Sequence, residues 1–256
     1  MSFIRSLPRS TCALVFALSS IGSGFAPAQQ TQRFPYPEKL TYRVEWRLIT
    51  AGSAIVRLSR DSADGWQFNF DLESAGLVTR LYKVLDTYRA AGNQRFCGVN
   101  TVLDAQEGKR HTVTRLTFEN TLHKLEYDQR DLVRNSTEKR NLTIPPCTYE
   151  IAGALAELRT TKLEPGSSTT LPITDGKKMV YGKIDAQTRE NVSIEGRKYQ
   201  AIRYEAFLFD NVLYKRKGRL FVWITDDSDR IPVQLRFQLA FPIGTITLEL
   251  QKQEKL

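Results

Sequence analysis

The sequence predicts a mainly β protein, built as a single curved antiparallel sheet, barrel-like or a sandwich, with one packed helix near residues 148–160. Three features predict it. Apolar and polar residues alternate along many short runs, turn residues separate most of these runs, and only one segment has clear helical spacing. Short strands at regular spacing are typical of antiparallel all-β domains. We predict a single β domain over residues 38–256, after a short tail at 29–37.

The first strand shows the alternation clearly. In LTYRVEWRL (residues 40–48), Tyr42, Val44 and Trp46 share one face, and Thr, Arg and Glu side chains share the other. A period of two indicates a strand with one buried face. Similar runs follow at residues 54–60, 66–74, 84–91, 98–104, 112–118, 124–128, 132–137, 179–184, 190–194, 199–209, 219–225, 231–239 and 245–250.

The helix is predicted from about Thr148 to Thr160. Ile151, Leu155 and Leu158 recur at i, i+4 and i+7, and form a stripe that must be buried against the sheet. Thr148 can cap the helix, a Glu two residues later suits its first turn, and a Pro-Gly pair ends it. The segment 76–82 stays ambiguous between helix and strand.

The first 28 residues have the features of a secretory signal peptide. Two arginines precede a short apolar stretch beginning at Ala13, and Ala26-Pro-Ala28 is a small-x-small cleavage pattern. We predict cleavage after Ala28, a periplasmic or secreted location, and no transmembrane span afterwards. The alternative is a single-pass anchor, which needs about 20 apolar residues, whereas Ser and Gly between residues 19 and 24 dilute this stretch.

Two cysteines, Cys97 and Cys147, remain after cleavage. In an oxidising compartment such a pair is usually bridged, so we predict a disulfide between them. The alternative is two free buried thiols.

The sequence shows no motif for chemistry. The sequence contains no zinc-ligand spacing, no nucleophile elbow and no phosphate-binding loop. A two-residue loop at Glu119-Asn120 would place His123 opposite Leu116 and His111 opposite Asp128, so the two histidines would not be partners. We therefore predict no enzyme activity, no catalytic, cofactor-binding or metal-binding residues, and no cofactor. Carboxylates that converge in space, as in a glycoside hydrolase, stay open as an alternative.

The most acidic stretch is TDDSDR, which holds Asp226, Asp227 and Asp229. It lacks the D-x-D-x-D-G spacing of a calcium loop. Asp and Ser side chains bond their own backbone in tight turns, and Pro232 suits the start of a returning strand. We interpret the stretch as a hairpin turn, in which Arg230 offsets part of the crowded charge.

The formal net charge is +9, and the densest basic clusters are Lys215–Arg219, Lys139-Arg140 and Lys177-Lys178. Export argues against a nucleic-acid partner. The clusters predict either attraction to anionic lipid headgroups and acidic polymers, or solvated hairpins that keep strand edges from aggregating.

The strands are rich in aromatic residues, which fill a packed core or line an apolar cavity. Our leading functional hypothesis is a non-catalytic exported protein that binds a lipid-like or apolar ligand in the curved sheet. The alternatives are a structural or interaction module that binds another envelope protein, and a carboxylate-dependent hydrolase.

Both ends of the chain resemble a family of exported bacterial proteins known as a domain of unknown function. The pattern is E-K-L-x-Y-x-V-x-W at the start and V-W-x-T-D-D-x-x-R-I-P-V near the end, here from Glu38 to Trp46 and from Val222 to Val233. Where that family's helix often reads S-A-L-Y-Y-L-R, this chain has Ala156 and Glu157 in place of the tyrosines. The resemblance implies an envelope β protein and no particular reaction. A more distant, architectural likeness is to periplasmic half-barrel lipoprotein carriers.

Overall fold

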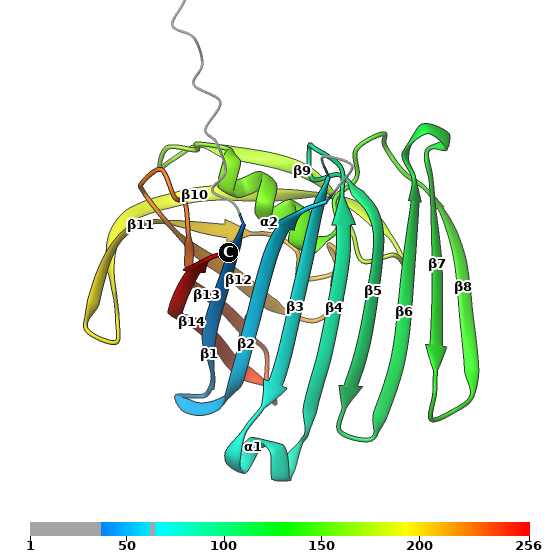
Figure 1. Ribbon diagram of the computed structural model, residues 1–256, viewed down its shortest axis with the longest axis horizontal. Helices are drawn as coiled ribbons and strands as arrows, with labels where there is room; N and C mark the ends of the chain where they lie inside the picture. Colours follow the sequence, from blue (N-terminus) through cyan, green and yellow to red (C-terminus); the bar gives the residue numbers. More distant parts are fainter. Residues whose placement is uncertain (1–36, 62–64) are drawn as a thin grey trace, which may run out of the picture. The chain divides into compact units, whose positions relative to one another are not determined.

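The computed structural model describes residues 37–61 and 65–256, and these form one 14-stranded antiparallel sheet that is strongly curved and not closed (Figure 1). The predicted signal peptide and its cleavage position lie outside the described residues. The first meander contains β1 (Glu38–Trp46), β2 (Ile49–Arg60), β3 (Trp66–Ser74), α1 (Gly76–Leu81), β4 (Val84–Gly92), β5 (Gly98–Glu107), β6 (Arg110–Glu119), the 3₁₀ turn η1 (Asn120–Leu122), β7 (Lys124–Asp131) and β8 (Ser136–Thr143). After α2 (Ile151–Thr160), the second contains β9 (Ser168–Thr174), β10 (Met179–Ile194), β11 (Arg197–Ala206), β12 (Gly218–Thr225), β13 (Pro232–Leu239) and β14 (Gly244–Lys255).

The two meanders are joined through β1, which pairs with both β2 and β14. The sheet order is therefore β8 to β1 followed by β14 to β9, and β8 and β9 are its two edges. This confirms the predicted mainly β fold with one curved antiparallel sheet. Because all strands belong to one sheet, the barrel-like alternative describes the protein better than the sandwich.

The alternation seen in the sequence sorts side chains between the two faces. Leu40, Tyr42 and Val44 of β1 are buried, and their neighbours in the same strand are only partly buried. β12 is the exception, since Leu220 to Thr225 are all buried. A continuous apolar run of this kind is typical of a central strand that is covered on both faces.

Helix α2 packs on the interior face of the sheet. Ala154, Ala156 and Leu158 share a buried cluster with Phe68 of β3 and Tyr204 of β11. The helix begins three residues later than predicted because Glu150, not Thr148, is its N-cap. The Glu150 carboxylate accepts hydrogen bonds from the backbone N–H groups of the second and third helical residues.

Three strand predictions need correction. β9 was not predicted, and the runs 179–184 and 190–194 form one strand, β10, with a bulge after Ala186. The run 132–137 is mainly the β7–β8 turn, because Leu132 and Val133 are exposed tip residues and β8 starts only at Ser136.

The two-residue loop assumed between the histidines was also wrong. Glu119 pairs with Lys124, and His123 adopts a left-handed conformation that ends the intervening 3₁₀ turn. His111 lies at the opposite end of the hairpin, where its Nε2 is 2.8 Å from Asp104 Oδ1.

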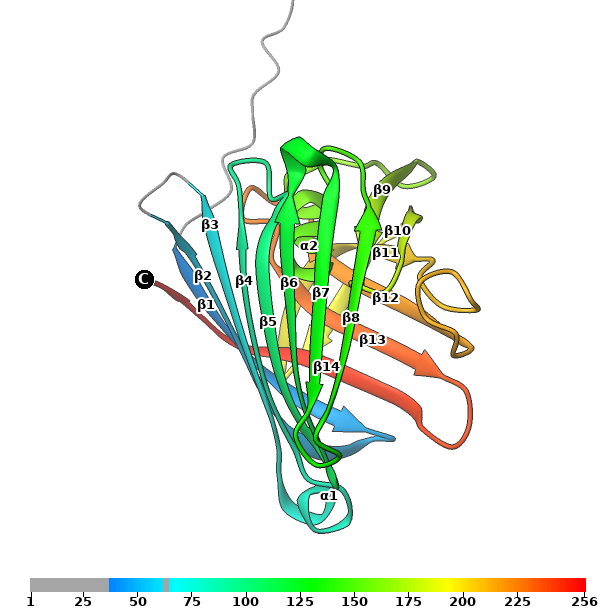
Figure 2. The ribbon, with the colours of Figure 1, turned by 90° about the vertical axis from the view of Figure 1, so that its right-hand side faces the viewer.

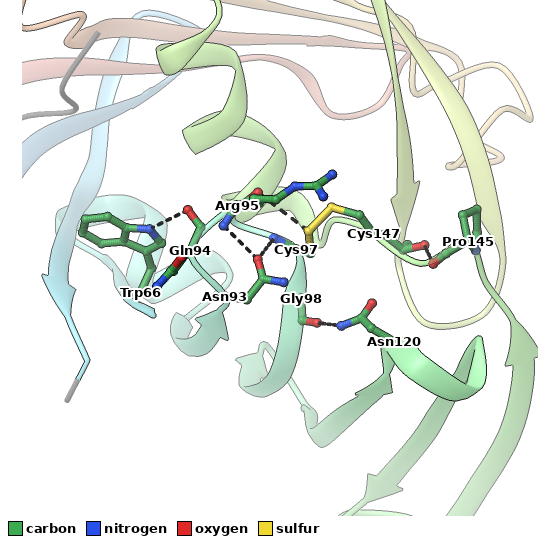
Figure 3. Close-up of a disulfide and its surroundings, with 10 residues drawn as sticks. Trp66, Asn93, Gln94, Arg95, Cys97, Gly98, Asn120, Pro145 and Cys147 are labelled. Atoms are coloured by element: carbon green, nitrogen blue, oxygen red, sulfur yellow. Dashed lines mark hydrogen bonds between the residues drawn. A yellow bond between two sulfur atoms is a disulfide. The ribbon is translucent and has the colours of Figure 1, made fainter. Parts of the chain in front are cut away.

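Cys97 and Cys147 lie next to each other, with Cα atoms 5.0 Å apart, in a disulfide (Figure 3). Cys97 directly precedes β5, and Cys147 follows β8. The Asn93 side chain shapes the loop before β5 by accepting hydrogen bonds from the Arg95 and Cys97 N–H groups. The bridge therefore ties together the two ends of the segment that contains β5 to β8.

The β9–β10 turn crosses towards the other edge of the sheet. Its Gly176 has φ +88°, and a Cβ there would lie 2.3 Å from Leu116 and 2.6 Å from Tyr127. Lys177 donates to Glu138 of β8 at 2.9 Å. Side chains therefore connect this turn to β6–β8, although no strand ladder joins β8 to β9.

Candidate functional site

A cavity of about 480 Å³ lies between α2 and the interior face of the sheet. Its walls come from β1 to β5, β13, β14 and α2, which are segments from both halves of the chain. Its apolar lining includes Leu40, Tyr42, Val44, Val56, Leu58, Phe68, Phe70, Leu72, Leu103, Leu235, Phe237, Leu239, Ile246 and Leu248. The volume lies within the range of small-molecule pockets, about 300–1,000 Å³.

The helix contributes an incompletely covered face to this cavity. Ile151, Ala152 and Leu155 line it, and Ile151 is 37% exposed although it lies on the predicted buried stripe. Only Leu158 of that stripe is fully packed. The prediction that the stripe is buried against the sheet thus holds for its C-terminal part, and its N-terminal part faces open space.

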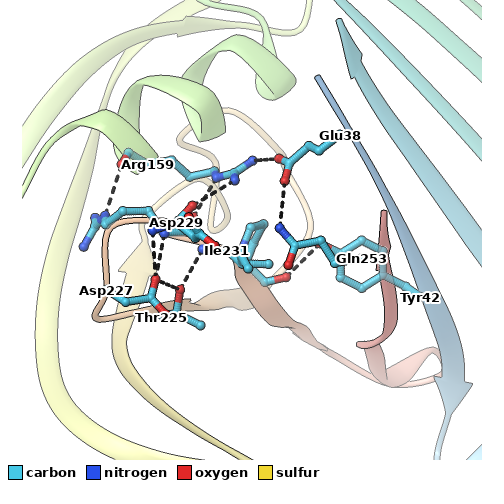
Figure 4. Close-up of polar contacts among 10 residues, drawn as sticks. Glu38, Tyr42, Arg159, Thr225, Asp227, Asp229, Ile231 and Gln253 are labelled. Atoms are coloured by element: carbon cyan, nitrogen blue, oxygen red, sulfur yellow. Dashed lines mark hydrogen bonds and ion pairs between the residues drawn. The ribbon is translucent and has the colours of Figure 1, made fainter. Parts of the chain in front are cut away.

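The C-terminal end of α2 is fixed by a buried ion pair. Arg159 Nη1 lies 2.5 Å from Glu38 Oε1, and the two side chains are 4% and 3% exposed (Figure 4). Gln253 of β14 also donates to Glu38, at 3.4 Å. Because Arg159 lines the cavity as well, the ion pair holds one cavity wall to the start of β1.

The predicted TDDSDR turn is present and has a role that was not predicted. Asp227 Oδ1 accepts from the N–H groups of Asp229 and Arg230 and from the Thr225 hydroxyl, which closes the turn (Figure 4). The Arg230 side chain donates to the carbonyls of Leu158, Arg159 and Thr161. In return, Arg159 Nε donates to the Arg230 carbonyl at 2.7 Å. Arg230 therefore caps α2 instead of only offsetting the neighbouring carboxylates.

Asp86 is a carboxylate in the cavity wall. It is 9% exposed, and it accepts one hydrogen bond from the Gln106 N–H at 3.0 Å. Burial, reinforced by the nearby Glu107 carboxylate, raises the pKa of Asp86 to about 6. The cavity can therefore change its charge within a physiological pH range.

Two tyrosines at the cavity are hydrogen-bonded within the protein. The Tyr88 hydroxyl donates to Glu150, the N-cap of α2. Burial raises the pKa of both the Tyr88 hydroxyl and the Glu150 carboxyl. The Tyr42 hydroxyl donates to the Pro232 carbonyl at 2.7 Å. These bonds orient the walls and leave the lining mostly apolar.

Several residues of the basic clusters predicted from sequence are engaged within the protein, whereas Lys215, Arg216 and Lys217 are exposed. Arg219 makes two hydrogen bonds to Glu205, at 2.7 and 2.9 Å. Arg140 and Lys177 both contact Glu138. Lys178 donates to backbone carbonyls of the loop before β12. These contacts favour the interpretation of solvated, structurally paired hairpins.

Within the described residues, no group of three or more His, Cys, Asp or Glu side chains is arranged to hold a metal ion. Over the same ranges, neither helix has the length and apolarity needed to cross a membrane.

The cavity residues could be predicted only in part. The alternation identified the inward side chains of β1, β3 and β13, but it could not tell a filled core from an unfilled one. Asp86 was not selected, although a lone carboxylate in the inward phase of 84–91 is a recognisable signal.

Comparison with solved structures supports the fold. A β-barrel-like protein from Brucella abortus, of domain of unknown function DUF1849, aligns with 10% identity and a TM-score of 0.61, covering 87% of this chain and 98% of that one. A structure of MucB in complex with MucA(peri) aligns with 6% identity over 86% of this chain and 90% of that one, but its TM-score of 0.18 is too low to support a shared fold. No curated protein matches the chain significantly.

The family model for proteins of unknown function DUF3108 matches residues 41–251. This range contains β1 from its fourth residue, all the cavity-lining strands, α2 and the TDDSDR turn. The chain therefore belongs to the DUF3108 family.

Proposed function

We propose that this protein is a non-catalytic, exported binding protein that holds one lipid-like ligand, with an acyl chain in the cavity beneath α2. The observation that carries the proposal is the 480 Å³ cavity with a mostly apolar lining in the interior of the sheet. An apolar chain gains about 0.8 kcal/mol for each buried methylene, so a pocket of this kind binds acyl chains without specific polar contacts. The disulfide between Cys97 and Cys147 supports a periplasmic or secreted location.

The position of the helix supports a binding role over a purely structural one. A structural module is stabilised when its apolar surfaces are packed, yet Ile151, Ala152 and Leu155 face the cavity. Helix α2 is also held by polar contacts at both ends, through Glu150 and Arg159. The helix therefore keeps its position without needing to fill the space beneath it.

Filling the cavity tests the proposal. We expect Ala152→Trp to weaken binding of a fluorescently labelled palmitic acid by at least about tenfold, because the indole ring would occupy space that the acyl chain needs. A tenfold change equals about 1.4 kcal/mol, which is less than the free energy gained by burying two methylenes. Titration by fluorescence measures it, with Leu122→Trp, at an exposed site on the β6–β7 turn, as the matched control. Unchanged binding in a folded Ala152→Trp variant, or no lipid in organic extracts of the purified wild-type protein, would contradict the proposal.

The Asp86 carboxyl gives a pH-dependent stability. Its folded-state pKa of about 6 lies above its unfolded value, so its contribution to the free energy of unfolding is fully present at low pH. This contribution is lost as pH rises through about 6. We expect Asp86→Asn to raise the free energy of unfolding at pH 8, by on the order of 2 kcal/mol, and to change it little at pH 4. Urea unfolding at the two pH values measures the difference. Asp229→Asn, on the β12–β13 turn, is the control, and an equal effect of Asp86→Asn at both pH values would refute the assignment.

A further inference from the structure

Five neighbouring connections, from the β13–β14 turn to the β7–β8 turn, form a row at one end of the sheet. The β1–β2 turn contacts the β13–β14 turn through Arg47, whose Nε donates to the Ile243 carbonyl at 3.1 Å. Helix α1 continues the row, since the N–H of Ala75 donates to Ala51 O of β2. The β5–β6 turn follows, with Gly108 N donating to Lys83 O at 2.7 Å. The β7–β8 turn completes it along the lower part of Figure 2.

Large apolar side chains are exposed at the tips of this row. Leu48 is 93% exposed and Phe241 is 89% exposed, on two turns that contact each other. Leu77 and Leu81 of α1, with exposed fractions of 61% and 68%, lie on the neighbouring segment. None of these four side chains is buried in the described structure, so they do not belong to its apolar core.

The same row carries mainly positive charge. The turn segments 47–48, 75–83, 108–110, 132–135 and 240–243 contain no carboxylate, and the strand ends beside them contribute Glu107 and Asp131, of which Asp131 lies 3.9 Å from Arg134. Their basic residues are Arg47, Arg80, Lys83, Lys109, Arg110 and Arg134. All six are exposed. Among the described residues, no carboxylate lies within ion-pair distance of Arg80, Lys83, Lys109 or Arg110. Turns at the opposite strand ends differ, since Glu195 and Asp226 occupy two of them.

We propose that this row of turns docks on an anionic lipid surface. Exposed leucine and phenylalanine tips can enter the boundary between headgroups and acyl chains, while lysine and arginine beside them contact the anionic headgroups. A protein partner of acidic character would pair with the basic residues, but it would leave Leu48 and Phe241 to be matched by a separate apolar surface. A lipid surface matches both features, because its acyl region accepts the apolar tips and its anionic headgroups bind the basic residues beside them.

Docking at this end would also bring the cavity to the membrane. Leu239 and Ile246 line the cavity and flank the β13–β14 turn that carries Phe241. An acyl chain would therefore have access from the lipid surface to the interior beneath α2. This access step rests on the proposed function, whereas the docking itself does not.

Location-specific quenching in the full chain tests the docking. Vesicles contain phosphatidylcholine carrying brominated acyl chains, with or without one quarter phosphatidylglycerol. We expect the added fluorescence of Phe241→Trp to be quenched by the vesicles that contain phosphatidylglycerol, and to recover at high salt, because charge screening weakens headgroup attraction. The added fluorescence of Leu122→Trp, on the turn that joins the other ends of β6 and β7, should stay unquenched. Equal quenching at both positions, or quenching at neither, would overturn the proposal.

A charge-reversal pair tests the electrostatic part in vesicle flotation. Each basic residue near an anionic surface strengthens the binding to that surface. The loss of two of them, as in Arg80→Glu/Lys109→Glu, should therefore weaken vesicle binding by at least about thirtyfold. The matched pair Lys162→Glu/Lys198→Glu lies outside the row and should change binding less than about threefold. Equal losses in both pairs would reject the assignment to this surface. Ala152→Trp separates the two proposals, because it should leave vesicle binding intact while it removes the bound acyl chain.

Discussion

Replacing Arg159 with methionine is expected to lower the free energy of unfolding by about 3–5 kcal/mol. The substitution leaves the Glu38 carboxylate, which is 3% exposed, without its cationic partner in a buried site. It also removes the hydrogen bond to the Arg230 carbonyl, so the docking of α2 on the β12–β13 turn is weakened. Chemical unfolding followed by tryptophan fluorescence measures the loss.

A double-mutant cycle separates the ion pair from the helix contact. Glu38→Gln together with Arg159→Met removes both charges, so the double variant should recover part of the stability that the single Arg159→Met variant loses. Arg57→Met is the matched control, because Arg57 pairs with Asp71 on the exposed face and should contribute only about 0–1 kcal/mol. A loss below about 1 kcal/mol for Arg159→Met would show that the buried pair does not hold the helix.

Removal of the disulfide is expected to cost about 2–5 kcal/mol. The bridge closes a loop with a sequence separation of 50, and the chain-entropy model assigns about 4 kcal/mol to a loop of this length. The effect should be large here because the closed loop contains β5 to β8, and this segment joins the rest of the sheet by a single ladder, between β4 and β5. Urea unfolding of Cys97→Ser/Cys147→Ser measures the difference.

The location of the loss can be checked by hydrogen exchange. Amide protection should fall more in β6 to β8 than in β1 and β14, since the latter have ladder partners from both halves of the chain. Treating the wild-type protein with a reducing agent should reproduce the effect, and the double serine variant should not respond further. Uniform loss of protection over all strands would contradict this account.

The sequence predicted the sheet and its helix because both depend on local periodicity. Period-two alternation in 40–48 and 66–74 is visible without tertiary information. The helix start was misplaced because Thr148 and Glu150 are both acceptable N-cap residues, and the choice is made by contacts. Glu150 is fixed by the Tyr88 hydroxyl from β4, 62 positions away in the chain.

The candidate site was less predictable than the fold. Whether the aromatic strands enclose a cavity depends on how far α2 lies from the sheet, which is set by Arg159, Glu38 and Arg230 from three distant segments. No local pattern encodes that distance. The docking end was missed for a related reason. Its six basic residues come from four turns that are far apart in sequence, whereas a search for dense clusters finds Lys215–Arg219 instead.

The missing ladder between β8 and β9 has a mechanical consequence. A fully closed barrel can widen only if backbone hydrogen bonds between neighbouring strands break. Here the two edges are held across the gap by the Lys177–Glu138 ion pair, by the packing of Gly176 on Leu116 and Tyr127, and by the Tyr149–Ile173 bridge between the segment after β8 and strand β9. The circumference of the sheet can therefore increase through the release of these few contacts, with every ladder of the sheet intact, so the interior can adapt to ligands of different size.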